Sequence, residues 1–406
     1  MFFCLFFASR RTFIIMKFKE DGIGVSDLLK LIPEDLLVHL AEETQVDYQV
    51  KKLHGMTMFK LILFGMASKD RIGLRTMEDF YNSRKFKNLS HLPGEASTKY
   101  NSLSARLANM NVDFFQKAYE LVYQQCSQLY DQSVLSSKYK ITRVDSTMVA
   151  QAANKLEKGI NVGRKKDGKK QIKYTVSLTE MFPSSVELFT QQKYISENLT
   201  IPKVILKAID RHKDNVFVFD RGVFSRDVFQ ELDQNDCSFV TRLSVKARHV
   251  VLQDLDNQGY LKHRNLTLLK DQRVHLYKTG KKVLEHPFRM LQTKNEKETQ
   301  YWFLTNRFDL KSREIIDIYK RRWDIEVFFR FLKQELNFSH FMSTNENGIK
   351  ILLYMTLILA MLILIYKSIN EFGYKTAKRR FAMELEHLID DEMIIRCGGD
   401  PNTYFW

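Results

Sequence analysis

The pattern of apolar residues changes at Lys140, and this change constrains the fold more than any other feature of the sequence. Before it, apolar side chains recur at helical spacing, as in residues 114–129. After it, residues 141–149 are rich in β-branched side chains, which favour strands. The sequence therefore predicts an all-helical N-terminal domain over residues 1–139, followed by a domain built on a sheet.

Strand and helix candidates alternate along the second part of the chain. Strands are expected at residues 172–178, 186–190, 216–219, 238–243, 274–277 and 301–305, and helices at 201–211 and 312–336. This mixture indicates an α/β core, a mixed sheet flanked by helices. We assign residues 140–222 and 309–370 to that core, 223–308 to a β-rich insertion and 371–406 to a C-terminal helical tail.

The longest apolar run without a charge covers residues 351–366. Its sixteen residues are fewer than the roughly 20 that a membrane-spanning helix needs, and an amphipathic charged segment directly precedes it. A buried core helix is the better interpretation, with a membrane anchor as the alternative. Residues 1–7 are also apolar, but their charges, Arg10 and Arg11, follow the run, unlike those of a signal peptide. We interpret residues 1–15 as a start-site artefact, with translation beginning at Met16.

Composition narrows the choice of partner. The chain carries 63 Lys and Arg against 48 Asp and Glu, a net charge of +15. Such a surplus favours a polyanion, because each phosphate that a cation neutralises releases condensed counterions. Nucleic acid is therefore expected rather than a membrane surface. The four cysteines are far apart and form no Cys-x-x-Cys pair, which argues against a structural zinc site and fits a reducing cytoplasm.

Two aspartates stand at apolar strands of the predicted sheet. Asp145 lies within residues 141–149, and Asp220 follows the run 216–219 at a point where the chain must turn. A carboxylate beside a buried strand is costly unless it is paired or binds a metal. Either aspartate alone also fits a helix cap or a turn. Together with a third acid on a helix, they supply the hard oxygen ligands that two magnesium ions need.

Glu326 is the third acid, and its surroundings are the most specific feature of the chain. On one continuous helix, at about 100° per residue, five polar side chains share a face within roughly 80° of arc. They are Tyr319, Arg322, Glu326, Arg330 and Lys333. A carboxylate flanked by cations suits phosphate binding, with Glu326 on metal. The alternative is a solvated face with i,i+4 pairs such as Arg322 with Glu326.

These residues carry a resemblance to a known family. The Y-x2-R-x3-E-x6-K signature is matched by Tyr319, Arg322, Glu326 and Lys333. With Val-Asp-Ser-Thr around Asp145 and Phe-Asp-Arg-Gly around Asp220, the chain resembles DDE transposases, and more narrowly the insertion-sequence-four family. A gap of 106 positions between Asp220 and Glu326 leaves room for the β-rich insertion. The resemblance covers residues 140–401 and is weaker over the helical region before them.

The resemblance implies an RNase H-like catalytic core in which Asp145, Asp220 and Glu326 coordinate two Mg²⁺ ions, for which Mn²⁺ can substitute. It implies a transposase of a bacterial insertion sequence, a mobile element. Such an enzyme cleaves DNA at the element ends and transfers the strand into target DNA by cut-and-paste. Family members act as dimers on paired terminal inverted repeats. We therefore expect double-stranded DNA as partner, a homodimer in the synaptic complex and a cytoplasmic, DNA-associated location.

Several side chains are expected to contact DNA. By match to the signature, these are Tyr319, Arg322 and Lys333, with Arg330 on the same predicted face. In some relatives an insertion-domain Trp stacks on a flipped base, and Trp302 is the Trp in that stretch. A core strand position is an equal alternative for Trp302. The basic turn with Arg164, Lys165 and Lys166 either grips the DNA backbone or is a solvated hairpin tip.

Two other functions compete with transposition. A metal-dependent nuclease of the RNase H type would share the fold and the acids, although it need not hold a transferred end. A non-catalytic DNA-binding protein derived from a transposase would not need all three acids. For the helical domain, binding of the element ends competes with a role in dimerisation or packing.

Overall fold

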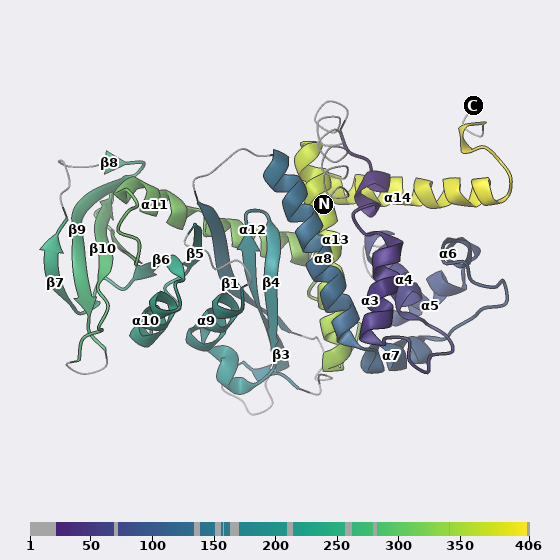
Figure 1. Ribbon diagram of the computed structural model, residues 1–406, viewed down its shortest axis with the longest axis horizontal. Helices are drawn as coiled ribbons and strands as arrows, with labels where there is room; N and C mark the ends of the chain where they lie inside the picture. Colours follow the sequence, from purple (N-terminus) through teal and green to yellow (C-terminus); the bar gives the residue numbers. More distant parts are fainter. Residues whose placement is uncertain are drawn as a thin grey trace, which may run out of the picture. The chain divides into compact units, whose positions relative to one another are not determined.

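The described chain divides into two units, shown in the computed structural model in Figure 1. The structure describes residues 22–68, 72–133, 139–150, 156, 158–162, 170–208, 214–255, 262–278, 282–340 and 342–403. The helical unit comprises Met1–Leu135, Gln151–Lys158 and Arg330–Trp406. The sheet unit comprises Ser136–Ala150 and Gly159–Phe329. Residues 1–15 lie outside the described residues.

The sheet unit contains one 11-stranded mixed sheet. Its strands are β1 (Lys140–Ala150), β2 (Ile160–Asn161), β3 (Lys170–Thr179), β4 (Phe182–Phe189), β5 (Asn215–Phe219), β6 (Ser238–Leu243), β7 (His249–Asp254), β8 (Lys262–His263), β9 (Leu266–Leu276), β10 (Phe288–Asn295) and β11 (Gln300–Thr305). The strand order is β2-β3-β1-β5-β6-β11-β10-β9-β7, with β4 paired to β3 and β8 to β9.

The first half of the sheet carries the expected core. β3 is antiparallel to β1 and to β4, whereas β5 runs parallel to both β1 and β6. The resulting order β4-β3-β1-β5-β6, with helices on the sheet, fits an RNase H-like fold. Two helices connect these strands, α9 (Glu197–Lys207) and α10 (Arg226–Gln234), and Figure 1 shows them beside β1 and β5.

The centre of the sheet is buried on both faces. All five residues of β5 are buried, as expected for a parallel strand covered on each side. Phe217 and Phe219 belong to an apolar cluster with side chains of α9 and α10. Val216 and Val218 belong to a second cluster with α11 (Ser312–Lys320). Successive side chains of β5 point to opposite faces of the sheet, so this one strand contributes to the apolar clusters on both faces.

Residues 223–308 do not form a separate sheet. β11 pairs with β6 in antiparallel fashion, and β10, β9 and β7 continue from it, so these strands extend the core sheet. The sequence predicted a β-rich insertion here, and this stretch does contain strands, β6 to β11. Its first strand, β6, pairs in parallel with β5, so it belongs to the core sheet, and the others continue that sheet from the edge of β6.

The helix expected at residues 312–336 is interrupted, and this prediction was wrong. α11 ends at Lys320, and α12 (Trp323–Glu335) begins after a turn at Arg321 and Arg322. In the turn, the amide of Asp324 donates to the carbonyl of Arg321, a tighter bond than an α-helix makes. Tertiary contacts of Arg321 and Asp324, described below, account for the break.

The helical unit consists of helices from both ends of the chain. They are α2 (Val25–Leu29), α3 (Glu34–Thr44), α4 (Gly55–Ser68), α5 (Leu74–Asn82), α6 (Arg84–Leu89), α7 (Tyr100–Asn109), α8 (Val112–Ser133), α13 (Glu346–Ile369) and α14 (Tyr374–Arg396). Among the described helices, α13 has the length and apolar composition that could cross a membrane, yet 89% of its apolar window is buried within the protein. That burial matches the prediction of a core helix.

The helices that surround α13 are not those of the sheet core, as we had expected. We placed residues 309–370 in the sheet core, but Arg330 onward belongs to the helical unit, where α13 packs against α4, α7 and α8. A helix that is apolar on all sides must be surrounded, and the helices of the N-terminal region supply that cover.

Candidate active site

Asp145 occupies the middle of β1 on the sheet unit. Its side chain is 18% exposed, and its Oδ1 accepts a hydrogen bond of 2.7 Å from the amide of Ser146. Burial is the main reason that the pKa of Asp145 rises from 3.8 to about 6, and the charges of Glu197 and Asp220 add to the rise. The carboxylate is thus held in a place that disfavours its own charge.

Asp220 follows the last residue of β5 and lies beside Asp145 in the sheet. In the parallel register Arg143 pairs with Val218, and two residues further along each strand stand Asp145 and Asp220. The hydroxyl of Tyr319, at the end of α11, donates to Asp220 Oδ1 at 3.0 Å. Burial and the charge of Asp220 both raise the pKa of Tyr319, so the phenol stays protonated as a donor.

Arg322 lies close to both Glu326 and Asp145. Its Nη2 lies 2.7 Å from Glu326 Oε1, and its Nη1 lies 4.0 Å from Asp145 Oδ2. The Arg322 side chain is only 14% exposed. Burial opposes its charge, but the hydrogen bond to Glu326 and the charge of Asp220 outweigh it and raise the pKa of Arg322. The structure therefore brings Asp145, Asp220, Glu326, Tyr319 and Arg322 together.

A fourth carboxylate, Glu197, belongs to the same place and is missing from the sequence-based prediction. It is the first residue of α9, and its Oε2 lies only 1.8 Å from where a Cβ on Gly222 would stand. The neighbouring Asn198 accepts hydrogen bonds from the amides of Phe224 and Ser225 through its Oδ1. The start of α9 therefore holds the loop after Asp220 by hydrogen bonds. Gly222 is required because a side chain there would collide with Glu197.

Lys173 carries the positive charge that interacts with Glu197. This lysine of β3 is 3% exposed, and its Nζ donates to the carbonyl of Ile195 at 3.0 Å. Burial lowers its pKa, while the charges of Glu197 and Asp145 oppose that change. Burial likewise raises the pKa of Glu197, against the effect of Lys173. A lysine within the strand expected at residues 172–178 is the sequence signal that could have pointed to this pair.

Three further parts of the chain carry the other predicted DNA contacts. Trp302 of β11 packs against an apolar cluster, with its ring 5.5 Å from that of His249. Arg330 and Lys333 lie further along α12, in the part that belongs to the helical unit. Burial lowers the pKa of Lys333. The basic turn with Arg164, Lys165 and Lys166 falls outside the described residues.

The site supplies carboxylate oxygens but, among the described residues, no closed metal site. Among the described residues, no group of three or more His, Cys, Asp or Glu side chains is closed around one point that could hold a metal ion. The guanidinium of Arg322 lies between Asp145 and Glu326 and neutralises part of their charge. Carboxylate oxygens are the ligands that Mg²⁺ prefers, and Asp145 and Glu197, whose pKa values are raised by burial, would be stabilised by added positive charge.

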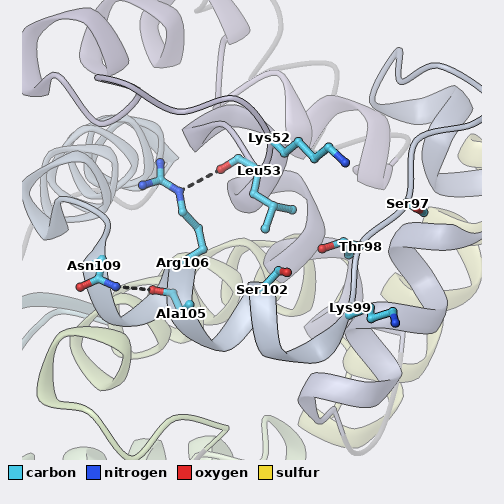
Figure 2. Close-up of a pocket in the computed structure, with 9 residues that line it drawn as sticks. All are labelled: Lys52, Leu53, Ser97, Thr98, Lys99, Ser102, Ala105, Arg106 and Asn109. Atoms are coloured by element: carbon cyan, nitrogen blue, oxygen red, sulfur yellow. Dashed lines mark hydrogen bonds between the residues drawn. The ribbon is translucent and has the colours of Figure 1, made fainter.

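A second candidate site is an open cavity in the helical unit, shown in Figure 2. Its volume is about 560 Å³, and its lining is basic and rich in hydroxyl groups. The lining residues are Lys52, Leu53, Ser97, Thr98, Lys99, Ser102, Ala105, Arg106 and Asn109. Arg106 is fixed by bonds to the carbonyls of Leu53 and Val46, at 3.0 and 2.7 Å. These groups suit an anionic ligand.

Two curated proteins similar to this chain are named as transposases. A protein named as a transposase from Sinorhizobium fredii is 26% identical over 188 residues, which cover 45% of this chain and 48% of that protein. A protein of Geobacillus stearothermophilus, named as a transposase for an insertion sequence element, is 22% identical over 280 residues, covering 68% of this chain and 69% of that protein. The matched region thus spans about half of the first relative's length.

A solved structure and a family model complete the comparison. The cryo-EM structure of the piggyBac transposase synaptic complex with hairpin DNA has a TM-score of 0.47 and 10% identity, covering 91% of this chain and 81% of that one. The model of the transposase DDE domain matches residues 136–362, more than half of the 406 residues. This match spans Asp145, Asp220 and Glu326. The chain therefore belongs to the family of transposases with a DDE domain.

Proposed function

We propose that this transposase serves a bacterial insertion sequence and moves it by metal-dependent DNA cleavage and strand transfer, in cut-and-paste fashion. Asp145, Asp220 and Glu326 are the carboxylates that would hold two Mg²⁺ ions, or Mn²⁺ in their place. The observation that carries the proposal is the position of Arg322, which bonds to Glu326 and approaches Asp145 within 4.0 Å. The match to the insertion-sequence-four signature points to the same residues.

When bound, the metal ions would activate the attacking oxygen and stabilise the leaving one. The side chains of the protein would bind the ions and orient the DNA end. Asp145 on β1 and Asp220 just after the neighbouring parallel strand β5 stand at matching positions, and the hydroxyl of Tyr319 donates to Asp220. The Arg322 guanidinium would donate two parallel hydrogen bonds to a phosphate of the DNA end.

The helical unit would supply further DNA contacts. Lys52 and Lys99 line its open cavity together with the hydroxyls of Ser97, Thr98 and Ser102, a set suited to the sugar-phosphate backbone. Backbone contacts of this kind add affinity and position without sequence choice. We propose that this unit helps bind the terminal inverted repeats of the element. A homodimer on two paired ends, acting in the bacterial cytoplasm, completes the proposal.

Labelled element ends and a target plasmid test the function. The DNA flanking the coding region supplies the terminal repeats for such substrates. The proposal expects nicked ends and labelled ends joined to the plasmid, both abolished by Asp145→Asn while end binding persists. Asp236→Asn, at an exposed turn of the same unit, is the matched control and should keep full activity. Cleavage without joined product would favour the nuclease, and joining by Asp145→Asn would refute the role of this carboxylate.

A further inference from the structure

A fully buried arginine, Arg143, lies two residues before Asp145 on β1. Its side chain has no exposed surface. Residues i and i+2 of a strand share one face of the sheet, so Arg143 and Asp145 project from the same side. A buried guanidinium is costly unless its donors are satisfied, so its partners show what the residue is for.

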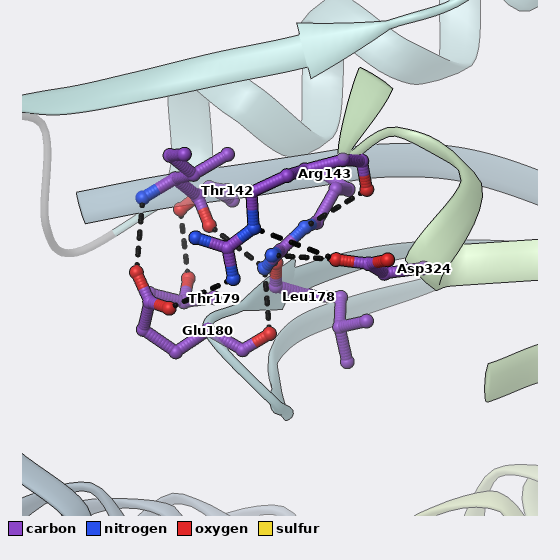
Figure 3. A network of polar contacts seen from close by, with 8 residues as sticks. Thr142, Arg143, Leu178, Thr179, Glu180 and Asp324 are labelled. Carbon is purple, nitrogen blue, oxygen red and sulfur yellow. Dashed lines mark hydrogen bonds and ion pairs between the residues drawn. The ribbon is translucent and has the colours of Figure 1, made fainter. Parts of the chain in front are cut away.

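The partners of Arg143 come from two sides, as Figure 3 shows. Toward the sheet, Nη1 donates to the carbonyls of Ile141 at 3.1 Å and Glu180 at 2.6 Å. Toward the turn between α11 and α12, Nε donates to the carbonyl of Arg321 at 3.2 Å, and Nη2 donates to Asp324 Oδ2 at 2.9 Å. One rigid guanidinium thus bridges the sheet and the turn.

A second arginine closes the network. Arg321 lies 3.3 Å from Glu180 Oε2 and 3.6 Å from Asp324 Oδ2. Asp324 thus pairs with both arginines, and Glu180 accepts from Arg143 through its carbonyl and pairs with Arg321 through its carboxylate.

The turn that Arg143 holds carries active-site groups. Arg321 immediately precedes Arg322, and Asp324 stands two residues before Glu326. We propose that Arg143 is a positioning residue, a clamp that holds this turn against β1 and so sets Arg322 and Glu326 opposite Asp145. This inference rests on the proposed function for its catalytic consequence, but the held position of the turn can be measured without any reaction.

Asp324→Ala is the informative variant, because Asp324 is 49% exposed, so its truncation removes a partner of Arg143 without opening a cavity in the apolar core. Asp309→Ala is the matched control. Asp309 is 54% exposed and pairs with the mostly buried Arg307 at 2.6 Å, in the same unit but away from the turn. Asp324→Asn is the conservative variant, since its amide oxygen can still accept from Arg143.

Hydrogen exchange of the full-length protein, followed by mass spectrometry, measures directly how firmly the turn between α11 and α12 is held. Asp324→Ala should speed exchange in peptides covering residues 319–326 and leave β5 unchanged. Asp324→Asn should restore protection in that segment, and Asp309→Ala should not alter it. Unchanged exchange at residues 319–326 in Asp324→Ala would overturn the clamp, whatever the enzyme does.

Single-turnover cleavage of a labelled element end, at saturating Mg²⁺, measures the effect of the turn's position on catalysis. Asp324→Ala should lower the cleavage rate by about 10- to 100-fold, as removal of a residue that orients metal ligands does, with end binding unchanged. Equal rates in Asp324→Ala and Asp309→Ala would refute the positioning role. Faster exchange in Asp324→Ala, together with a wild-type protein that cannot cleave, would instead count against the proposed function and leave the clamp standing.

Discussion

Asp145→Asn should stabilise the metal-free protein, although it removes a carboxylate of the active site. The pKa of Asp145 rises from 3.8 to about 6 in the fold, so the native state prefers the protonated form. Ionised Asp145 therefore destabilises the fold. This penalty is absent below pH 3.8, grows as pH rises toward 6, and is complete above that value. Asparagine keeps the shape and carries no charge at any pH.

The magnitude follows from the displacement of the pKa. At about 1.36 kcal/mol per pKa unit, a rise from 3.8 to about 6 corresponds to roughly 3 kcal/mol above pH 6. The side chain is only 18% exposed, so solvent screening reduces this value little. The amide of Ser146 can still donate to the Oδ1 of asparagine, so this hydrogen bond is preserved.

Urea unfolding in excess chelator measures the effect, with tryptophan fluorescence as the probe. Trp302 and Trp323 both belong to the sheet unit, so they report on the unit that contains Asp145. The variant should be more stable than wild type by about 2–3 kcal/mol near pH 7.5 and should match it near pH 4. A variant less stable at the higher pH, or a difference independent of pH, would refute the burial argument. Asp236→Asn should show no such dependence.

Two further predictions concern the loop after Asp220 and the helical unit. Gly222→Ala should lower cleavage by about 100-fold, because its Cβ would stand 1.8 Å from Glu197 Oε2 and displace either the carboxylate or the loop. Single-turnover rates check this, and Glu197→Ala in the same chain should recover part of the activity if the clash is the cause. Replacing Lys52 and Lys99 by alanine should reduce the salt dependence of end binding by about two units of slope, because each lysine neutralises one phosphate of the DNA. Fluorescence anisotropy over a salt series measures it, and an unchanged slope would remove the cavity from the DNA interface.

The strands that carry Asp145 and Asp220 could be predicted from the sequence because local pattern determines them. β-branched and aromatic residues dominate β1 and β5, and a strand buried on both faces reads as a continuous apolar run. The acids that end or interrupt such runs stand out. For the same reason the burial of α13 was predictable, but its packing partner was not, since apolarity indicates burial without naming the neighbour.

The turn at Arg321 and Arg322 could not be predicted, because its cause lies 178 positions earlier in the chain, at Arg143. Helical spacing runs through the turn without a break, whereas Arg143 and Glu180, which contact Arg321 and Asp324 in the turn, lie far away in the sequence. Arg289 in β10 gives a similar case. Its guanidinium is paired with Asp271 at 2.6 Å in the interior, so two charged residues stand where a strand pattern calls for apolar ones.

Glu197 escaped prediction for another reason. Standing after Ser196 at the start of a helix, it matches an ordinary acidic residue of a first helical turn. Its role depends on the approach of α9 to Gly222, which no local pattern records. The active site was thus predictable where strand and signature patterns mark it, and hidden where tertiary packing alone brings a residue in.

Replacement of the acids by cysteine tests the central claim, that Asp145 and Glu326 hold the metal ions. A thiolate binds Mg²⁺ poorly and Mn²⁺ better, so a true ligand changes its metal preference when oxygen becomes sulfur. The account predicts that wild type joins labelled ends to target DNA with either ion, and that Asp145→Cys and Glu326→Cys do so with Mn²⁺ but not with Mg²⁺. Joining by wild type in excess chelator, or full activity of both cysteine variants with Mg²⁺, would contradict it.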